Sequence, residues 1–125
     1  MIVIKASQMQ AIETPNGNFG TSLATPSRGA NEVSVVRQRQ SPGGFNPSHT
    51  QNHEEVMVQL SGSVTVSSGE EKIVLEPGDT LIIPAQTLHR VDNTGETDAE
   101  WLIVSKAGVK FFRETGEEAI PGWAK

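Results

Sequence analysis

The chain of 125 residues contains no cysteine and no tyrosine, and only 5% of its residues are aromatic. Without cysteine it can form neither a disulfide nor a thiolate ligand, so any metal ion must be held by nitrogen and oxygen atoms. No stretch approaches the roughly 18 consecutive apolar residues that span a bilayer, and the N-terminus lacks the pattern of a secretory signal. We therefore expect a cytoplasmic protein with no membrane partner.

Positive charge is also scarce in this chain. Lysine and arginine number 10 against 15 aspartates and glutamates, which gives a formal net charge of -5. Binding to a phosphate backbone depends on clustered lysine and arginine, so we expect no nucleic-acid partner. The length matches the commonest size of one compact core, and we expect a single domain over residues 1–125.

Helical periodicity is absent from every stretch of ten or more residues, whereas short alternating segments and turn residues recur along the chain. Strands spaced roughly 8–12 residues apart with turns between them predict an all-β sandwich or barrel. We expect a turn-rich loop over residues 14–20 and, at the C-terminus, an outer arm or short helix over about 107–125. The expected strands cover residues 2–4, 33–40, 55–60, 64–67, 72–75, 80–83, 88–91 and 100–105.

Four residues with metal-binding chemistry stand at alternate positions: His49, Gln51, His53 and Glu55. On an extended segment such residues share one face, and a third imidazole could join them from His89. This set of nitrogen and oxygen ligands suits a first-row transition metal. The simpler interpretation is that the histidines lie in surface loops and the glutamate is solvated, as polar residues usually are.

Two segments of the chain resemble the two sequence motifs of the cupin superfamily. Residues 43–62 resemble the first motif, and residues 78–93 the second. The matching residues are Gly43, His49, Glu55, Gly62, Gly78, Pro84, His89 and Asn93. Gln51 stands where the family has a second histidine, and Gln86 stands where it has a glycine. The resemblance implies a single-domain double-stranded β-helix, the jelly-roll barrel of small RmlC-like cupins.

The resemblance further implies one divalent transition metal held by His49, Gln51, Glu55 and His89. Because a carboxamide oxygen is a weaker and harder ligand than imidazole, we expect manganese first, then iron, nickel, cobalt or zinc. A bulge in the chain would instead let His53 coordinate in place of Gln51. The spacing favours Gln51, which leaves His53 as the candidate for proton transfer near neutral pH.

The strand over residues 55–60 has two faces of different character. If Glu55 points into the barrel, Met57 and Gln59 do so as well, and three aliphatic residues point outward. These outward residues are Val56, Val58 and Leu60. An aliphatic outer face needs cover, so we expect a homodimer interface or a packed N-terminal strand there, and dimers are common among the cupins that the chain resembles.

Candidate pocket residues lie on two of the expected strands. Met57 and Gln59 face inward by the argument above, and Arg37 and Arg39 share one face of the strand over residues 33–40. Arginine on a strand is more often solvated than functional. An arginine that reached the cavity would select an anionic or polyhydroxylated substrate.

Small cupins similar to this chain include dioxygenases, decarboxylases, isomerases and sugar-binding modules, and a shared fold does not choose among them. An open coordination position on the metal suits oxidation or isomerisation. We therefore expect a metalloenzyme, a metal-dependent oxidoreductase or isomerase, acting on a small polar, oxygen-rich molecule. The alternative is a non-catalytic cupin that binds a small molecule or sugar.

Overall fold

A computed structural model describes all 125 residues and contains twelve strands and three single-turn 3-10 helices. The helices are η1 (Ala6–Gln8), η2 (Pro26–Arg28) and η3 (Gly122–Ala124). None of them has the length and hydrophobicity needed to cross a membrane. The expected all-β class is therefore confirmed.

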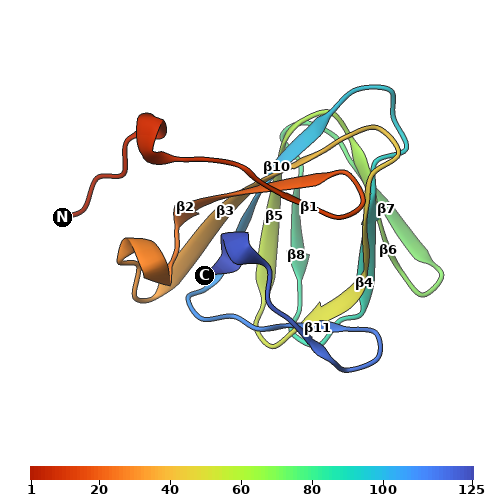
Figure 1. The fold of residues 1–125 in the computed structure, drawn as a ribbon. Helices are drawn as coiled ribbons and strands as arrows, with labels where there is room; N and C mark the ends of the chain where they lie inside the picture. Colours follow the sequence, from red (N-terminus) through yellow and green to blue (C-terminus); the bar gives the residue numbers. More distant parts are fainter.

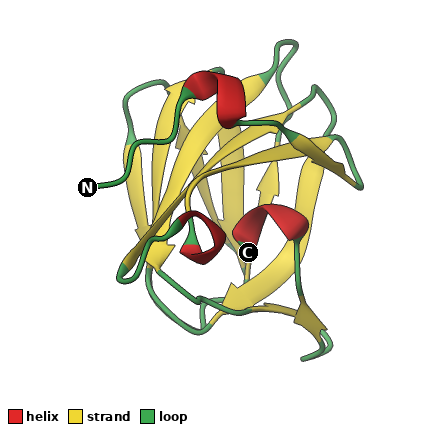
Figure 2. Ribbon diagram, turned by 60° about the vertical axis from the view of Figure 1, so that its left-hand side comes forward, coloured by secondary structure: helices red, strands yellow, loops and turns green.

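The strands form two six-stranded antiparallel sheets that enclose a jelly-roll barrel (Figures 1 and 2). The first sheet contains, in spatial order, β1 (Ile12–Thr14), β2 (Asn18–Ala24), β3 (Val33–Gln40), β10 (Ala99–Lys106), β5 (Glu55–Ser61) and β8 (Thr80–Ile83). The second contains β12 (Glu118–Ala119), β11 (Phe111–Arg113), β4 (Phe45–Gln51), β9 (His89–Asp92), β6 (Val64–Ser68) and β7 (Glu71–Leu75). The order places β4 beside β9, so segments that are far apart in sequence meet in space.

The core lies between the sheets and follows the alternation of the strands. On β10 the residues Ala99, Trp101 and Ile103 are buried, while their neighbours along the strand are more exposed. Trp101 is the largest buried side chain, at 1% exposure. The remaining buried apolar residues of this cluster are Val36, Met57, Val64, Val66, Leu75, Ile83 and Val91.

The sequence-based strand predictions agree with most of the sheet. The segments 33–40 and 80–83 coincide with β3 and β8, and five other predicted strands match within two residues. The predicted strand at residues 2–4 is wrong, and no predicted strand covers β1, β2, β4, β11 or β12. Glycine and asparagine made residues 14–20 resemble one long loop, but only Asn16 and Gly17 adopt the positive φ angles of a tight turn, at 70° and 77°.

The C-terminal segment links the two sheets rather than forming only an outer arm. Its strand β11 pairs with β4, and Phe111 is buried. The chain then returns to the first sheet, where the Ser22 hydroxyl donates a hydrogen bond to the Trp123 carbonyl. Figure 1 shows this segment, in dark blue, running from β11 toward β2. The segment therefore closes one side of the barrel.

The outer face of the first sheet carries an uninterrupted aliphatic row. The register aligns Val35, Val104, Val56 and Ile82 across β3, β10, β5 and β8. Glu55, Met57 and Gln59 are buried, so the inward and outward faces predicted for this strand are as expected. The predicted N-terminal strand does not form. The homodimer stays a prediction.

Asn93 of the second cupin motif fastens two loops together. Its side-chain amide donates hydrogen bonds to the carbonyls of Gln40 at 3.0 Å and Thr97 at 2.9 Å. Its side-chain oxygen accepts from the Gly95 amide at 3.0 Å, and its carbonyl accepts from the Gly43 amide at 2.9 Å. The residue is buried, and its role in the motif is to hold the chain that enters β4 in place.

Candidate metal centre

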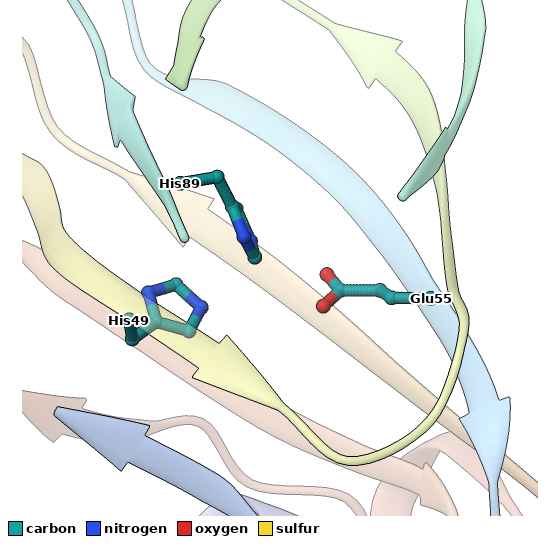
Figure 3. A group of neighbouring side chains, drawn as sticks. All are labelled: His49, Glu55 and His89. Atoms are coloured by element: carbon teal, nitrogen blue, oxygen red, sulfur yellow. The ribbon is translucent and has the colours of Figure 1, made fainter. Parts of the chain in front are cut away.

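Three of the predicted ligands converge inside the barrel. His49 on β4 and His89 on β9 stand directly opposite each other, with ring centroids 4.3 Å apart. Glu55 begins β5 on the other sheet and points toward both rings (Figure 3). One ligand atom from each residue lies within 4.8 Å of the others. The jelly-roll order of the strands thus brings residues 49, 55 and 89 to one point.

Both imidazoles are held in the orientation that a metal requires. The Nδ1 atom of His49 lies 2.8 Å from the Pro47 carbonyl, and that of His89 lies 2.8 Å from the Thr87 carbonyl. A carbonyl only accepts hydrogen bonds, so each Nδ1 carries the proton and each Nε2 has a free lone pair. The Nε2 atom of His89 is buried without a partner. This arrangement is typical of metal-binding histidines.

Burial shifts the pKa of each of the three groups toward its neutral form. Desolvation raises the pKa of Glu55 to about 7. It also lowers the pKa of His89 to about 4, with a smaller contribution from the charge of His49, and it lowers the pKa of His49. In the absence of a cation, burial keeps these groups neutral. A cation beside them would supply the opposite charge that the Glu55 carboxylate lacks, and the neutral imidazoles are already in the form that binds a metal.

Gln51 ends β4 and is 1% exposed. Contact with its amide lowers the pKa of Glu55, against the larger rise caused by desolvation, but the contact does not have full hydrogen-bond geometry. Both the oxygen and the nitrogen of the amide therefore lack a partner. Buried polar atoms are seldom left unpaired, and a cation beside Glu55 would satisfy the amide oxygen. The residues present thus fit a divalent ion.

His53 lies outside this cluster. The strand β4 ends at Gln51 and β5 begins at Glu55, so the extended geometry that would align residues 49 to 55 is interrupted. His53 is half-buried in the connecting loop, and it neither joins the group of His49, Glu55 and His89 nor lines the cavity. The expectation that His53 transfers protons in the site does not fit this position.

The cluster opens into a cavity of about 700 Å³. This volume is within the range of about 300–1,000 Å³ that is usual for ligand pockets. Next to the three candidate ligands, its walls include the aromatic residues Trp101, Phe111 and Trp123. A small molecule in this cavity would be in reach of the cluster.

Two of the predicted pocket residues point into the barrel, but only one reaches the cavity. Met57 lines it, next to Glu55. Gln59 is buried at 1% exposure and uses its amide nitrogen to donate to the carbonyls of Ser61 and Gly62, both at 3.1 Å. Gln59 therefore holds the turn that follows β5 and does not line the cavity.

Arg37 and Arg39 lie on the outer face of β3, so their prediction as pocket residues is corrected. Arg37 pairs with Glu100 at 2.7 Å, and Arg39 pairs with Asp98 at 3.3 Å. The inward positions of this strand belong to the alternate residues. The two arginines are solvated surface residues, which is the commoner role on a strand.

Several cavity residues were not predicted from the sequence. Trp101 could have been found, because alternation along residues 99–106 places it on the same face as Ile103. Phe111, Arg113 and Trp123 come from the C-terminal segment, whose sequence carries no clear periodicity. Their place in the cavity depends on the pairing of β11 with β4, which no local sequence pattern predicts.

Comparison with known proteins agrees with this geometry. The family model described as a cupin domain matches residues 36–105. The chain belongs to the cupin family. Among curated proteins, this cupin is 30% identical over 117 residues to auxin-binding protein 1 of Arabidopsis thaliana and 31% identical over 104 residues to oxalate oxidase 1 of Hordeum vulgare. These matches cover 80% and 74% of the chain but only 59% and 51% of the relatives, so the chain spans little more than half of their length.

Solved structures show the same fold. The polyketide cyclase RemF from Streptomyces resistomycificus superposes with a TM-score of 0.76 at 19% identity, covering 87% of this chain and 81% of RemF. A recombinant oxalate oxidase in complex with glycolate superposes with a TM-score of 0.68 at 26% identity, covering 80% of this chain and 58% of the oxidase. The likeness to RemF concerns the fold alone.

Proposed function

We propose that this cupin is a metal-dependent enzyme that acts on a small, oxygen-rich organic molecule by oxidation or isomerisation. The observation that carries the proposal is the pair of imidazoles with free Nε2 atoms that face Glu55 inside the cavity. A divalent ion bound there supplies a Lewis acid with coordination positions open to a ligand. Manganese is the first choice, because the fourth candidate donor is the amide oxygen of Gln51.

The chain's own residues position this chemistry. The Pro47 and Thr87 carbonyls hold the two imidazoles in the required tautomer. The aromatic residues give the cavity an apolar wall beside the cluster. Relatives that match this chain include oxalate oxidases, and one solved oxalate oxidase contains glycolate, which supports a small oxygen-rich acid as the kind of substrate.

A second candidate is a binding protein without catalysis. Two observations favour it: auxin-binding proteins are among the relatives, and the only histidine outside the cluster lies away from the cavity. Without a free imidazole, proton transfer would depend on groups that also hold the metal. The two candidate functions use the same metal centre. They differ in whether the bound molecule is converted to a product.

The test combines metal analysis with a substrate screen. Purified protein is supplemented separately with manganese, iron, nickel, cobalt and zinc, its metal content is measured, and oxygen uptake and substrate loss are followed with hydroxy acids, keto acids and diketones. We expect about one ion per chain and turnover that disappears in His89→Ala but persists in His53→Ala. A folded protein that binds no metal contradicts the proposal, and metal-dependent binding without turnover supports the second candidate.

A further inference from the structure

Arg113 lies in line with the candidate metal ligands. The pairing of β11 with β4 places Arg113 opposite His49, and His49 is in turn opposite His89. Directly opposite residues on antiparallel strands project from the same face, with Cβ atoms about 4.5–5.5 Å apart. The three residues therefore form one row on the cavity side of the second sheet.

No other lysine or arginine lines the cavity. The side chain of Arg113 forms an ion pair with Glu117 at 3.6 Å, and the two side chains are 63% and 71% exposed. An exposed pair of this kind contributes little stability and exchanges partners readily. The guanidinium of Arg113 is therefore available to an anionic ligand, which it can bind through two parallel hydrogen bonds if that ligand is a carboxylate.

The walls of the cavity beyond this row are aromatic. Phe111 stands two residues from Arg113 on the same strand and packs edge-on against Trp123, with ring centroids 5.6 Å apart. Trp101 contributes a second indole from the first sheet. Gly20 makes room for Trp123, because a Cβ atom there would overlap the indole ring.

We infer that the cavity binds an organic acid with a flat apolar body. The body packs against the pair formed by Phe111 and Trp123, and the carboxylate pairs with Arg113. A wholly polar acid would leave the half-buried indole of Trp123 in contact with water, at a cost that grows with the exposed apolar area. The inference rests on the proposed function, since it names the substrate class of that site, but the contacts it invokes do not include the metal.

Two charged residues on the outer face of the barrel serve as controls. Glu13, on β1, is exposed and stands opposite Phe19, which in turn stands opposite Arg39, so its side chain projects from the outer face. Removing its charge tests whether Arg113→Gln acts only through the net charge of the protein. Arg37 provides a control that should have no effect on binding, because it is an ion-paired arginine on the outer face of the barrel.

The two tryptophans of the chain report on the cavity directly. Both line it, and the protein contains no tyrosine, so its fluorescence arises from Trp101 and Trp123. The experiment titrates the protein, with manganese and separately with a chelator, using 3-phenylpropionate, the uncharged 3-phenylpropanamide, and propionate. Emission and calorimetric heat are measured in parallel.

We expect 3-phenylpropionate to change the emission and to bind at least tenfold more tightly than the other two compounds. Arg113→Gln should weaken binding of the acid about tenfold and leave binding of the amide unchanged. Glu13→Gln and Arg37→Gln should each leave binding of the acid unchanged, and Trp123→Leu should weaken binding of the acid and the amide alike.

Equal affinity of wild type and Arg113→Gln for 3-phenylpropionate overturns the inference, as does the absence of any binding of that acid. The two proposals fail separately. A protein that binds the acid through Arg113 but takes up no metal contradicts the proposed function and supports this inference. A protein that holds the metal but binds no acid supports the proposed metal site and contradicts this inference.

Discussion

At position 51 a carboxamide stands where the cupin motif has a second imidazole, and the structure shows what that change does. The side chain of Gln51 is buried beside Glu55, with both amide atoms unpaired. An unpaired buried amide costs free energy unless a partner is supplied. The amide oxygen is a neutral donor, so it favours a harder ion than three imidazoles would.

Replacing Gln51 tests whether the amide takes part in metal binding. We predict that Gln51→Ala weakens manganese affinity about tenfold, comparable to the loss of a group that supports a metal site. His53→Ala is the matched control, because His53 lies in the adjacent loop outside the cluster. Calorimetric titration of both variants makes the comparison. A larger loss in His53→Ala than in Gln51→Ala would contradict this assignment.

Glu55 makes the stability of the metal-free protein depend on pH. Burial raises the pKa of its carboxyl from a usual value of 4.5 to about 7. The folded state therefore holds this proton more strongly than the unfolded state. Its contribution to stability is fully present below the unfolded pKa and is lost as the pH rises through about 7.

Comparison with Glu55→Gln isolates this effect, since His49 and His89 titrate in both proteins. With a chelator present, we predict that the stability of wild type relative to Glu55→Gln falls by about 3 kcal/mol between pH 4.5 and pH 8. Urea denaturation at several pH values measures the difference. Parallel pH profiles for the two proteins would show that the carboxyl is not held in its neutral form.

At the scale of elements, local sequence predicted the regular strands and failed where long-range pairing decides the structure. Alternation correctly placed Glu55, Met57 and Gln59 inside the barrel. The same rule could not detect that β4 stops at Gln51, so it placed His53 with the ligands. Extended geometry continues only as long as the strand does, and the end of a strand depends on its partners.

The C-terminal segment is a second case in which local sequence did not predict a strand. Its short strand β11 has only three residues, too few for a periodic pattern, yet it carries Phe111 and Arg113 into the cavity. Its pairing with β4 provides the backbone contacts that make it a strand. Such a pairing between residues about 60 positions apart leaves no local signal in one sequence.

Two glycines of the first motif differ in how much room their surroundings leave for a side chain, and the difference can be measured as a loss of stability on substitution by alanine. Gly62 has φ of 62° and faces the backbone of Asp98 and Ala99, which an added Cβ would overlap. Gly43 has φ of 79° and no heavy atom within 4 Å of an added Cβ. We predict that Gly43→Ala costs about 1 kcal/mol from its backbone conformation, whereas Gly62→Ala costs about 2 kcal/mol more through the clash. Equal unfolding midpoints would contradict this.

At the scale of the whole molecule, the two cupin motifs were sufficient to predict the jelly roll and three converging residues. The motifs encode the topology indirectly, because their spacing fits strands β4, β5 and β9 in that order. The aliphatic row on the outer face of the first sheet was predicted in part, through Val56. What covers that row depends on how chains assemble.

We predict that the row is buried in a homodimer. A stable dimer typically covers about 800 Å² on each partner, and four aligned aliphatic residues supply a suitable centre. Sedimentation should show a dimer for wild type and a monomer for a variant with Val56→Lys and Val104→Lys. Val74→Lys is the control, since Val74 is 56% exposed on the other sheet. A monomeric wild type at tens of micromolar would contradict the prediction.

The central claim is that His49, Glu55 and His89 hold one divalent ion inside the barrel. The most direct measurement is anomalous diffraction from crystals of the protein loaded with manganese. The account predicts a single anomalous peak about 2.0–2.3 Å from the Nε2 atoms of both histidines and from a Glu55 oxygen. A peak elsewhere, or none in crystals grown with excess manganese, would contradict the account.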